Sequence, residues 1–284
     1  MIPPLGDLDA WLADREGRAG GVRPGCDKRA TWADGARRTP WAVVYVHGFS
    51  ASRREASPWP ERVAEGLGAN LFATRLAGHG QDGAAMDRAA LPLWRADVAE
   101  AFAVGRSLGD RLLVLSCSTG CTLVALAMAE GEAADGAAML SPNFGLTMRR
   151  LQAALDAPFA ATWAPWIIRG KQAPPAANRG SGIWSAGYTT RAYAPLAQAV
   201  RAARRADFEA IHAPALFAFS DADQIVDPGL TTQVARRWGG TVRELRLASG
   251  PGDDPANHVL AGDALSPGLT DRVVRETLAW ARAL

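Results

Sequence analysis

Short runs of apolar residues alternate with segments of helical periodicity along most of the chain. The apolar runs, each typical of a buried strand, are residues 41–48, 70–76, 111–116, 136–141, 215–220 and 242–247. Patterns with a helical repeat lie near residues 60–68, 93–107, 119–131, 229–238 and 268–284. Strands and helices that alternate in this way predict an α/β fold, with a mostly parallel twisted sheet and helices on both of its faces.

The first 40 residues carry a weaker pattern. We expect them to supply a leading edge of the sheet, and the stretch RATWADG at residues 29–35 resembles part of a hairpin.

One long interval, residues 146–207, breaks the alternation, although a crossover between parallel strands needs only about 15 residues. Its aromatic residues are Phe159, Trp163, Trp166, Trp184, Tyr188 and Tyr193. The interval predicts either extra helices that pack among themselves or a helical cap over the carboxyl edge of the sheet, where open α/β sheets bind ligands. We favour the cap, which divides the chain into a core of residues 1–145 and 208–284 and a cap or lid insertion of residues 146–207.

Composition fits a globular protein with a large core. The chain has 284 residues, of which 48% are hydrophobic and 21% charged. Its 31 basic and 29 acidic side chains nearly balance, and no basic stripe is interleaved with aromatic residues, so nucleic acid is not an expected partner. The oligomeric state is not indicated.

The amino terminus shows neither a basic segment followed by an apolar one nor a run approaching about 18 apolar residues, so we expect no signal peptide and no membrane span. The three cysteines, Cys26, Cys117 and Cys121, are too few for a disulfide framework. A cytoplasmic location is the resulting expectation.

Two candidate nucleophile elbows lie close together. Ser107, in GRSLG, matches the strict G-x-S-x-G pattern, whereas Ser118, in SCSTG, departs from it at the first position. A nucleophile elbow requires a strand before the serine and a helix after it. Ser107 follows a helical pattern, but Ser118 lies between the apolar run RLLVLS and the helix-forming run TGCTLVALAM. The sequence therefore predicts Ser118 as the nucleophile.

A serine nucleophile needs a histidine base, which in turn needs an orienting carboxylate. Of the four histidines, only His258 follows both the elbow and an acidic cluster at a strand end, in the order Ser, Asp, His. We expect the other candidates His79 and His212 to make local structural hydrogen bonds. The acidic cluster DADQIVDP contains Asp221, Asp223 and Asp227. Asp227 precedes a proline and a helix and is predicted to cap that helix, whereas Asp221 and Asp223 remain open as alternatives.

The ordered motifs VHGF, LAGHG, SCSTG, SDADQIV and NHVLAG resemble those of the α/β-hydrolase superfamily, in particular its capped serine esterases and monoacylglycerol-lipase-like carboxylesterases. This resemblance covers residues 41–284. It implies Ser118 as nucleophile, Asp223 as acid and His258 as base, with the backbone N–H groups of Phe49 and Thr119 as the oxyanion hole. Two positions depart from the motifs, because serines replace the usual glycines at residues 116 and 220.

The resulting prediction is a hydrolase that cleaves carboxylic esters with apolar, short to medium acyl groups through an acyl-enzyme. A C–C bond hydrolase or thioesterase with the same triad, and a non-catalytic binding module with this fold, are the alternatives. Cys117 and Cys121 flank the elbow but do not occupy its apex, so we expect them to be small buried side chains. No ligand-spaced histidine or cysteine cluster is present, and we expect neither a metal nor a cofactor.

Overall fold

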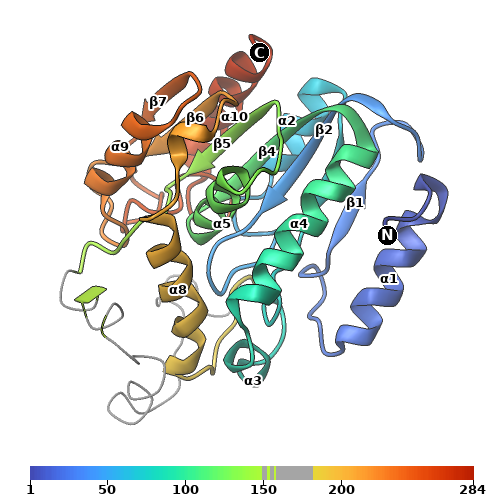
Figure 1. The fold of residues 1–284 in the computed structure, drawn as a ribbon, viewed down its shortest axis with the longest axis horizontal. Coiled ribbons are helices and arrows are strands. Elements are labelled where there is room, and N and C mark those ends of the chain that lie inside the picture. The colour runs from blue at the N-terminus through green and yellow to red at the C-terminus, as the bar shows by residue number, and fades with distance from the viewer. Residues whose placement is uncertain (149–151, 154–156, 158–181) are drawn as a thin grey trace.

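A computed structural model describes residues 1–148, 152–153, 157 and 182–284. Within these residues, seven strands form one sheet in the order β1-β3-β2-β4-β5-β6-β7, and every neighbouring pair except β1 and β3 is parallel (Figure 1). The strands are β1 (Arg29–Thr31), β2 (Thr39–Val46), β3 (Asn70–Ala73), β4 (Gly109–Cys117), β5 (Gly136–Leu140), β6 (Ala215–Phe219) and β7 (Val242–Arg246). All six strands predicted from apolar runs are present, and the predicted fold class is confirmed.

The helices alternate with these strands. They are α1 (Leu8–Ala19), α2 (Trp59–Leu67), α3 (Gly83–Asp87), α4 (Leu91–Leu108), α5 (Thr119–Ala129), α8 (Tyr193–Ala203), α9 (Pro228–Arg237) and α10 (Pro267–Ala281). No helix in the described ranges is long and apolar enough to cross a membrane.

The central strands are apolar because both of their faces are covered. Residues 42–46 of β2 and all of β5 are buried. Helices α4 and α5 cover one face of the sheet, where Trp94 and Phe102 are fully buried, and α2 and α10 cover the other (Figure 1). On that second face, the indole N–H of Trp59 donates to the hydroxyl of Thr277 at 3.1 Å and joins α2 to α10. The sheet is therefore a rigid support for the loops at its carboxyl edge.

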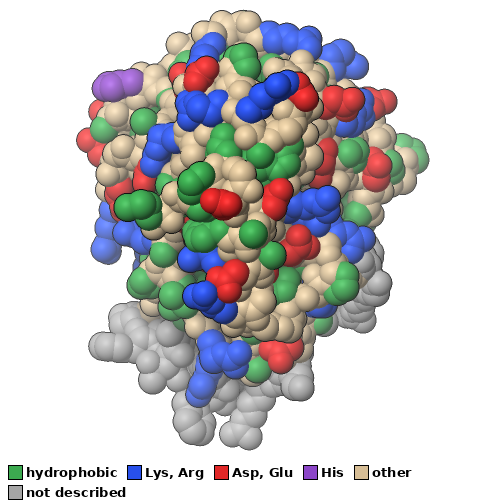
Figure 2. All heavy atoms as spheres, turned by 90° about the vertical axis from the view of Figure 1, so that its right-hand side faces the viewer, with side chains coloured by type: hydrophobic (Ala, Val, Ile, Leu, Met, Phe, Trp, Pro, Cys, Tyr) green, Lys and Arg blue, Asp and Glu red, His purple; other side chains and the backbone are tan. Residues whose placement is uncertain are grey.

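The leading edge differs in one respect from the prediction. β1 does lie at an edge, but Ala30 pairs with Phe72 of β3 in an antiparallel register, and β3 separates β1 from the next strand in sequence. The predicted hairpin is therefore wrong, because the hydrogen bonds of β1 go to a strand about 40 residues away. Figure 2 shows the side of the molecule that carries α1, where basic and acidic side chains are interspersed.

Only the last part of the predicted cap belongs to the described residues. Phe159, Trp163 and Trp166 lie outside them. Trp184 and Tyr188 are buried, and α8 packs against α4 and α5 of the core. The division into core and cap stays a prediction.

Candidate active site

Ser118 lies at the turn between β4 and α5, where the chain reverses from the buried strand into the helix. Its backbone has φ 50° and ψ −116°, a conformation that is strained for a residue with a side chain. The turn is close to β2, because a Cβ atom on Gly120 would lie 2.2 Å from the carbonyl oxygen of Val46. Ser107, by contrast, is within α4, and its hydroxyl donates to the carbonyl of Val104 at 2.7 Å. The preference for Ser118 as the elbow residue thus agrees with the local fold.

The serine at position 116 takes the place of the usual motif glycine without loss of packing. Ser116 is fully buried, and its hydroxyl donates to the thiol sulfur of Cys121 at 3.3 Å. Because Cys121 lies in the first turn of α5, this bond joins the end of β4 to the helix.

His258 lies beside Ser118 although the two are 140 residues apart. Its Nε2 is 3.0 Å from the Ser118 hydroxyl, and its Nδ1 is 2.8 Å from Oδ2 of Asp223. Since a carboxylate only accepts, Nδ1 carries the proton and donates it, which leaves Nε2 to accept from the serine. The structure therefore brings together Ser118, His258 and Asp223, the three side chains that the family resemblance nominated.

The two aspartates left open by the sequence have different environments. Asp223 is buried, and its second oxygen, Oδ1, accepts the backbone N–H groups of Ile225 and Val226 at 2.8 and 2.9 Å. Asp221 is exposed and forms an ion pair with Arg246. The turn thus directs Asp223, and not Asp221, to His258.

The loops that carry the acid and the base are joined by the backbone N–H of Gln224, which donates to the carbonyl of Ala256 at 2.9 Å. The hydroxyl of Ser220, the second departure from the motif, accepts the N–H of Ala222 at 3.2 Å within the acid turn. Asn257 has φ 54°, a conformation that asparagine tolerates, and its Oδ1 accepts the N–H of Ser249 at 2.8 Å.

Asp227 accepts the N–H of Gly229 at the start of α9, which confirms its predicted capping role.

The charge state of His258 reflects two opposing effects. Burial alone would lower its pKa, but the neighbouring carboxylates, Asp223 foremost, together more than offset this, so the pKa is raised above its usual value of 6.5. Asp254, whose Oδ2 accepts the N–H groups of His258 and Val259, acts in the same direction. A proton acquired at His258 is therefore stabilised in this site.

The backbone N–H groups of Phe49 and Thr119 lie after β2 and at the first residue of α5. Within the described part of the chain, neither N–H donates to another protein group. His47 holds the first of these two loops: the N–H of Leu76 donates to its Nε2 at 3.2 Å, so Nδ1 carries the proton and donates to the carbonyl of Gly48 at 2.9 Å. That carbonyl belongs to the same peptide group as the Phe49 N–H.

This role of His47 was not predicted from the sequence, although its position between a strand and Gly48 was the available signal. Burial lowers the pKa of His47 to about 4, so it is neutral at pH 7. His79 makes the expected local bond, to the carbonyl of Ala77 at 3.2 Å. His212 is exposed just before β6, at the opposite edge of the sheet.

Aromatic side chains surround the loop after β2. The Phe49 ring stacks on Tyr193 at a centroid distance of 5.2 Å and meets Tyr188 edge-on at 5.7 Å. The backbone N–H of Ser185 also donates to the carbonyl of Ser50 at 2.6 Å. The described end of the predicted cap thus contacts the candidate oxyanion loop directly.

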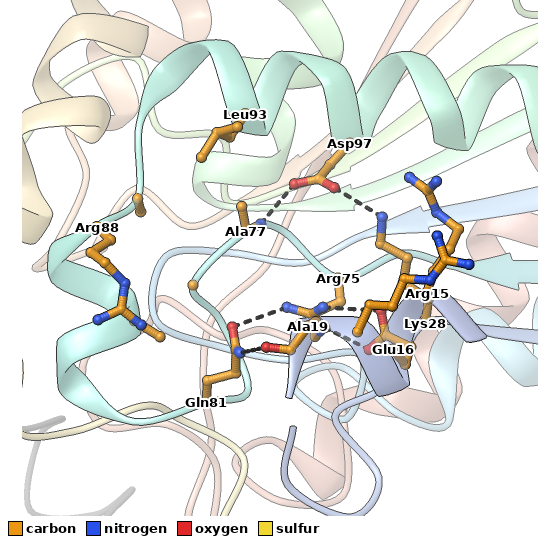
Figure 3. Close-up of a pocket in the computed structure, with 14 residues that line it drawn as sticks. Arg15, Glu16, Ala19, Lys28, Arg75, Ala77, Gln81, Arg88, Leu93 and Asp97 are labelled. Atoms are coloured by element: carbon orange, nitrogen blue, oxygen red, sulfur yellow. Dashed lines mark hydrogen bonds and ion pairs between the residues drawn. The ribbon is translucent and has the colours of Figure 1, made fainter. Parts of the chain in front are cut away.

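A cleft of about 430 Å³ lies between α1, the loop after β3 and α4, and Figure 3 shows the residues that line it. None of the three nominated side chains lines it. Four of its charged groups form two ion pairs: Arg75 bonds to Glu16 at 2.7 Å, and Lys28 bonds to Asp97 at 2.9 Å. The first pair joins α1 to the loop after β3, and the second joins the segment before β1 to α4, so we interpret the cleft as a polar seam and not as the substrate site.

Cysteine and metal chemistry find little support in the described residues. Cys117 and Cys121 are buried, and burial raises the pKa of both thiols, that of Cys121 to about 12. Both are free, as is Cys26. The described residues contain no group of three or more His, Cys, Asp or Glu side chains that could hold a metal ion.

Fold and site together define a hydrolase of the α/β-hydrolase superfamily. The sequence model of one family, described as "Serine aminopeptidase, S33", matches residues 37–251, which is most of the chain. The protein belongs to this family, and the predicted superfamily is confirmed.

Solved structures of lipases and esterases share the fold. A structure of the metagenome-derived lipolytic enzymes LipS and LipT has a TM-score of 0.73 at 20% identity, covering 93% of this chain and all of that one. A soluble variant of monoglyceride lipase from Saccharomyces cerevisiae has a TM-score of 0.64 at 12% identity, covering 89% and 90%. Est1E from Butyrivibrio proteoclasticus with bound ferulic acid has a TM-score of 0.61 at 16% identity, covering 90% and 94%. No curated protein matches the chain by sequence.

Proposed function

We propose that the protein hydrolyses carboxylic esters through an acyl-enzyme, with Ser118 as nucleophile, His258 as base and Asp223 as the orienting acid. The observation that carries this proposal is the hydrogen-bonded series from the Ser118 hydroxyl through His258 to Asp223, at 3.0 and 2.8 Å. The oxyanion hole is formed by the N–H groups of Phe49 and Thr119.

Each residue has a defined part in the reaction. Ser118 attacks the ester carbonyl while Nε2 of His258 accepts its proton, and the Asp223 carboxylate stabilises the imidazolium that forms. The negative oxygen that develops on the carbonyl accepts from Phe49 and Thr119, and loss of one such donor typically costs ~3–4 kcal/mol of transition-state stabilisation. His258 then protonates the leaving alcohol, and water repeats the cycle to release the acid.

The preferred substrate is an ester with an apolar acyl group of short to medium length. The aromatic contacts of Phe49 with Tyr188 and Tyr193 support this preference, because they place apolar surface next to the proposed oxyanion donor. The described lipolytic and monoglyceride-lipase structures have the same fold, which supports the ester class. A neutral ester should therefore react faster than an analogue of the same size with a charged acyl group, and equal rates would contradict the preference.

The description of the family makes hydrolysis at a peptide amino terminus the second candidate. Such a substrate carries an ammonium group, which a free carboxylate would recognise. The three carboxylates that act on His258 in the described part of the chain, Asp223, Glu55 and Asp254, each already accept backbone N–H groups. Esters are therefore the better-supported class, while thioesters and C–C bonds next to a carbonyl remain alternatives for the same residues.

Two further proposals accompany this function. Residues 146–207 form a cap over the site, supported by the contacts of Ser185, Tyr188 and Tyr193 with the loop after β2. The protein acts in the cytoplasm, supported by its unpaired cysteines.

The test is hydrolysis of a p-nitrophenyl acyl ester series, run beside an aminoacyl p-nitroanilide. Wild type, Ser118→Ala and Ser107→Ala are compared, each also exposed to a fluorophosphonate probe. We expect ester turnover and labelling in wild type and Ser107→Ala, and neither in Ser118→Ala. Labelling that persists in Ser118→Ala would contradict the assignment of the nucleophile, and faster turnover of the anilide than of any ester would favour the aminopeptidase.

A further inference from the structure

Glu55 is a buried carboxyl group that the proposed reaction does not use. It lies in the loop between β2 and α2 and is only 3% exposed. Its Oε2 accepts the backbone N–H of Gly48 at 2.8 Å and the hydroxyl of Tyr45 at 3.3 Å. Burial raises the pKa of Glu55 above its usual value. A carboxyl group is costly to bury, so this position calls for a physical reason.

The bond to Gly48 connects Glu55 with the proposed oxyanion hole. Glu55 holds the N–H of Gly48, while His47 holds its carbonyl at 2.9 Å. The Gly48 carbonyl and the Phe49 N–H belong to one peptide group. Gly48, which precedes Phe49, is thus held at both its N–H and its carbonyl. The two side chains together restrict rotation of this peptide, which decides where the Phe49 N–H points.

Packing leaves little freedom for this arrangement. A Cβ atom on Gly48 would lie 2.8 Å from Oε1 of Glu55 and 3.1 Å from Cβ of Ser118. Gly48 is therefore packed tightly between the carboxyl group of Glu55 and the side chain of Ser118. Any shift of Gly48 that follows the loss of its bond to Glu55 changes the geometry between Ser118 and the adjacent N–H donor.

We propose that Glu55 is a positioning residue of the ester hydrolase, which fixes the Gly48–Phe49 peptide so that the Phe49 N–H points at the developing oxyanion. The proposal rests on the proposed function. Glu55 acts through Gly48 and exchanges no proton with substrate. What matters is the reach of its side chain to the Gly48 N–H, and its charge is secondary.

An opposing interpretation assigns Glu55 a purely electrostatic role. Its negative charge helps to raise the pKa of His258, together with Asp223 and Asp254. Two substitutions separate the interpretations. Glu55→Gln keeps the length of the side chain and an oxygen that can accept from Gly48, but removes the charge. Glu55→Asp keeps the charge, but the side chain is one methylene too short to reach the same N–H.

The experiment measures kcat and KM of wild type and both variants on a p-nitrophenyl ester. Positioning predicts that Glu55→Gln retains kcat within about fivefold, since a neutral acceptor replaces a charged one. It predicts that Glu55→Asp loses about 100-fold in kcat, the scale of a misplaced catalytic group, with KM nearly unchanged. A trifluoromethyl ketone adds to Ser118 and then carries an oxyanion. Its affinity for Glu55→Asp should fall in parallel with kcat.

Thr277→Val is the matched control, because it removes a buried hydrogen bond on the same face of the sheet, between α2 and α10, without contact to Gly48. Its kcat should equal that of wild type. If Glu55→Asp does not fold, Glu55→Met replaces it, with the same expected loss. A kcat for Glu55→Gln below that of the shorter variant, or a loss confined to KM, would overturn the proposal. An inactive wild type would instead refute the ester hydrolase on which it rests.

Discussion

Acidification should destabilise this protein through His47. The side chain is fully buried, and its Nε2 accepts the N–H of Leu76 at 3.2 Å. A proton added at Nε2 would face the N–H of Leu76, which is also a donor. Burial in addition disfavours the charged form of the ring. The pKa of His47 in the folded protein is accordingly about 4, against 6.5 for an unperturbed histidine. The unfolded chain therefore takes up a proton at His47 at a pH where the folded protein does not.

The size and sign of the effect follow from this difference. The gap of about 2.5 pKa units corresponds to ~3 kcal/mol of unfolding free energy. Because the folded pKa is the lower one, this stability is fully present above pH 6.5 and is lost as the pH falls toward about 4. Burial lowers the pKa of His79 as well, which adds to the loss. The raised pKa of His258 acts in the opposite sense, so its contribution is present below pH 6.5 and is lost as the pH rises through the folded value.

A comparison with His47→Gln isolates the contribution of this residue. Urea unfolding is followed by tryptophan fluorescence at several pH values between about 7.5 and 4, and the stability of the variant is subtracted from that of wild type at each pH. We expect this difference to fall by ~3 kcal/mol across the range. The matched control is His212→Gln, which replaces an exposed histidine and should change the unfolding free energy by less than about 0.5 kcal/mol. Parallel profiles for wild type and His47→Gln would refute the reasoning.

The remaining predictions concern the acid, the elbow and the thiols. Asp223→Asn should lower kcat about 10⁴-fold in an ester assay because the His258 tautomer is no longer fixed, whereas Asp221→Asn, at an exposed ion pair, should change it less than about threefold; the reverse order would contradict the assignment. Gly120→Ala should reduce the urea-unfolding free energy by about 3 kcal/mol, because the new Cβ meets the backbone of β2, and unchanged stability would disprove that close contact. Cys117 and Cys121 should resist iodoacetamide in the native protein and react in urea, as followed by mass spectrometry, since both are buried and their pKa values are raised; rapid native labelling would show that the elbow is open.

Local sequence patterns were sufficient to predict the order of elements and the position of the candidate elbow. The run RLLVLS followed by TGCTLVALAM predicts a strand, a turn and a helix, and the structure has β4, Ser118 and α5 in that order. The same reasoning rejected Ser107, which matches the motif letters but lies within α4. Both conclusions depend on periodicity over about ten residues, which a single sequence contains.

Pairing between segments that are distant in the chain was harder to predict from the sequence. The stretch around β1 carries strand-like residues, but its register with Phe72 of β3 depends on which edge of the sheet is free. The substitution of serine for glycine at position 116 could not be judged from the sequence either. Its accommodation depends on the contact between Ser116 and Cys121, which follows from the angle at which α5 leaves the strand.

The sequence by itself determined the alternating α/β pattern, the elbow at Ser118 and the position of the histidine that could serve it. Only the tertiary structure directs Asp223 toward His258 and Asp221 toward solvent, because that choice rests on backbone bonds within one turn and on contacts between residues 35 apart. It also brings Glu55 to Gly48. Periodicity is a local property of the chain, whereas the direction of a polar side chain is decided by the partners that it finds once packing has excluded water.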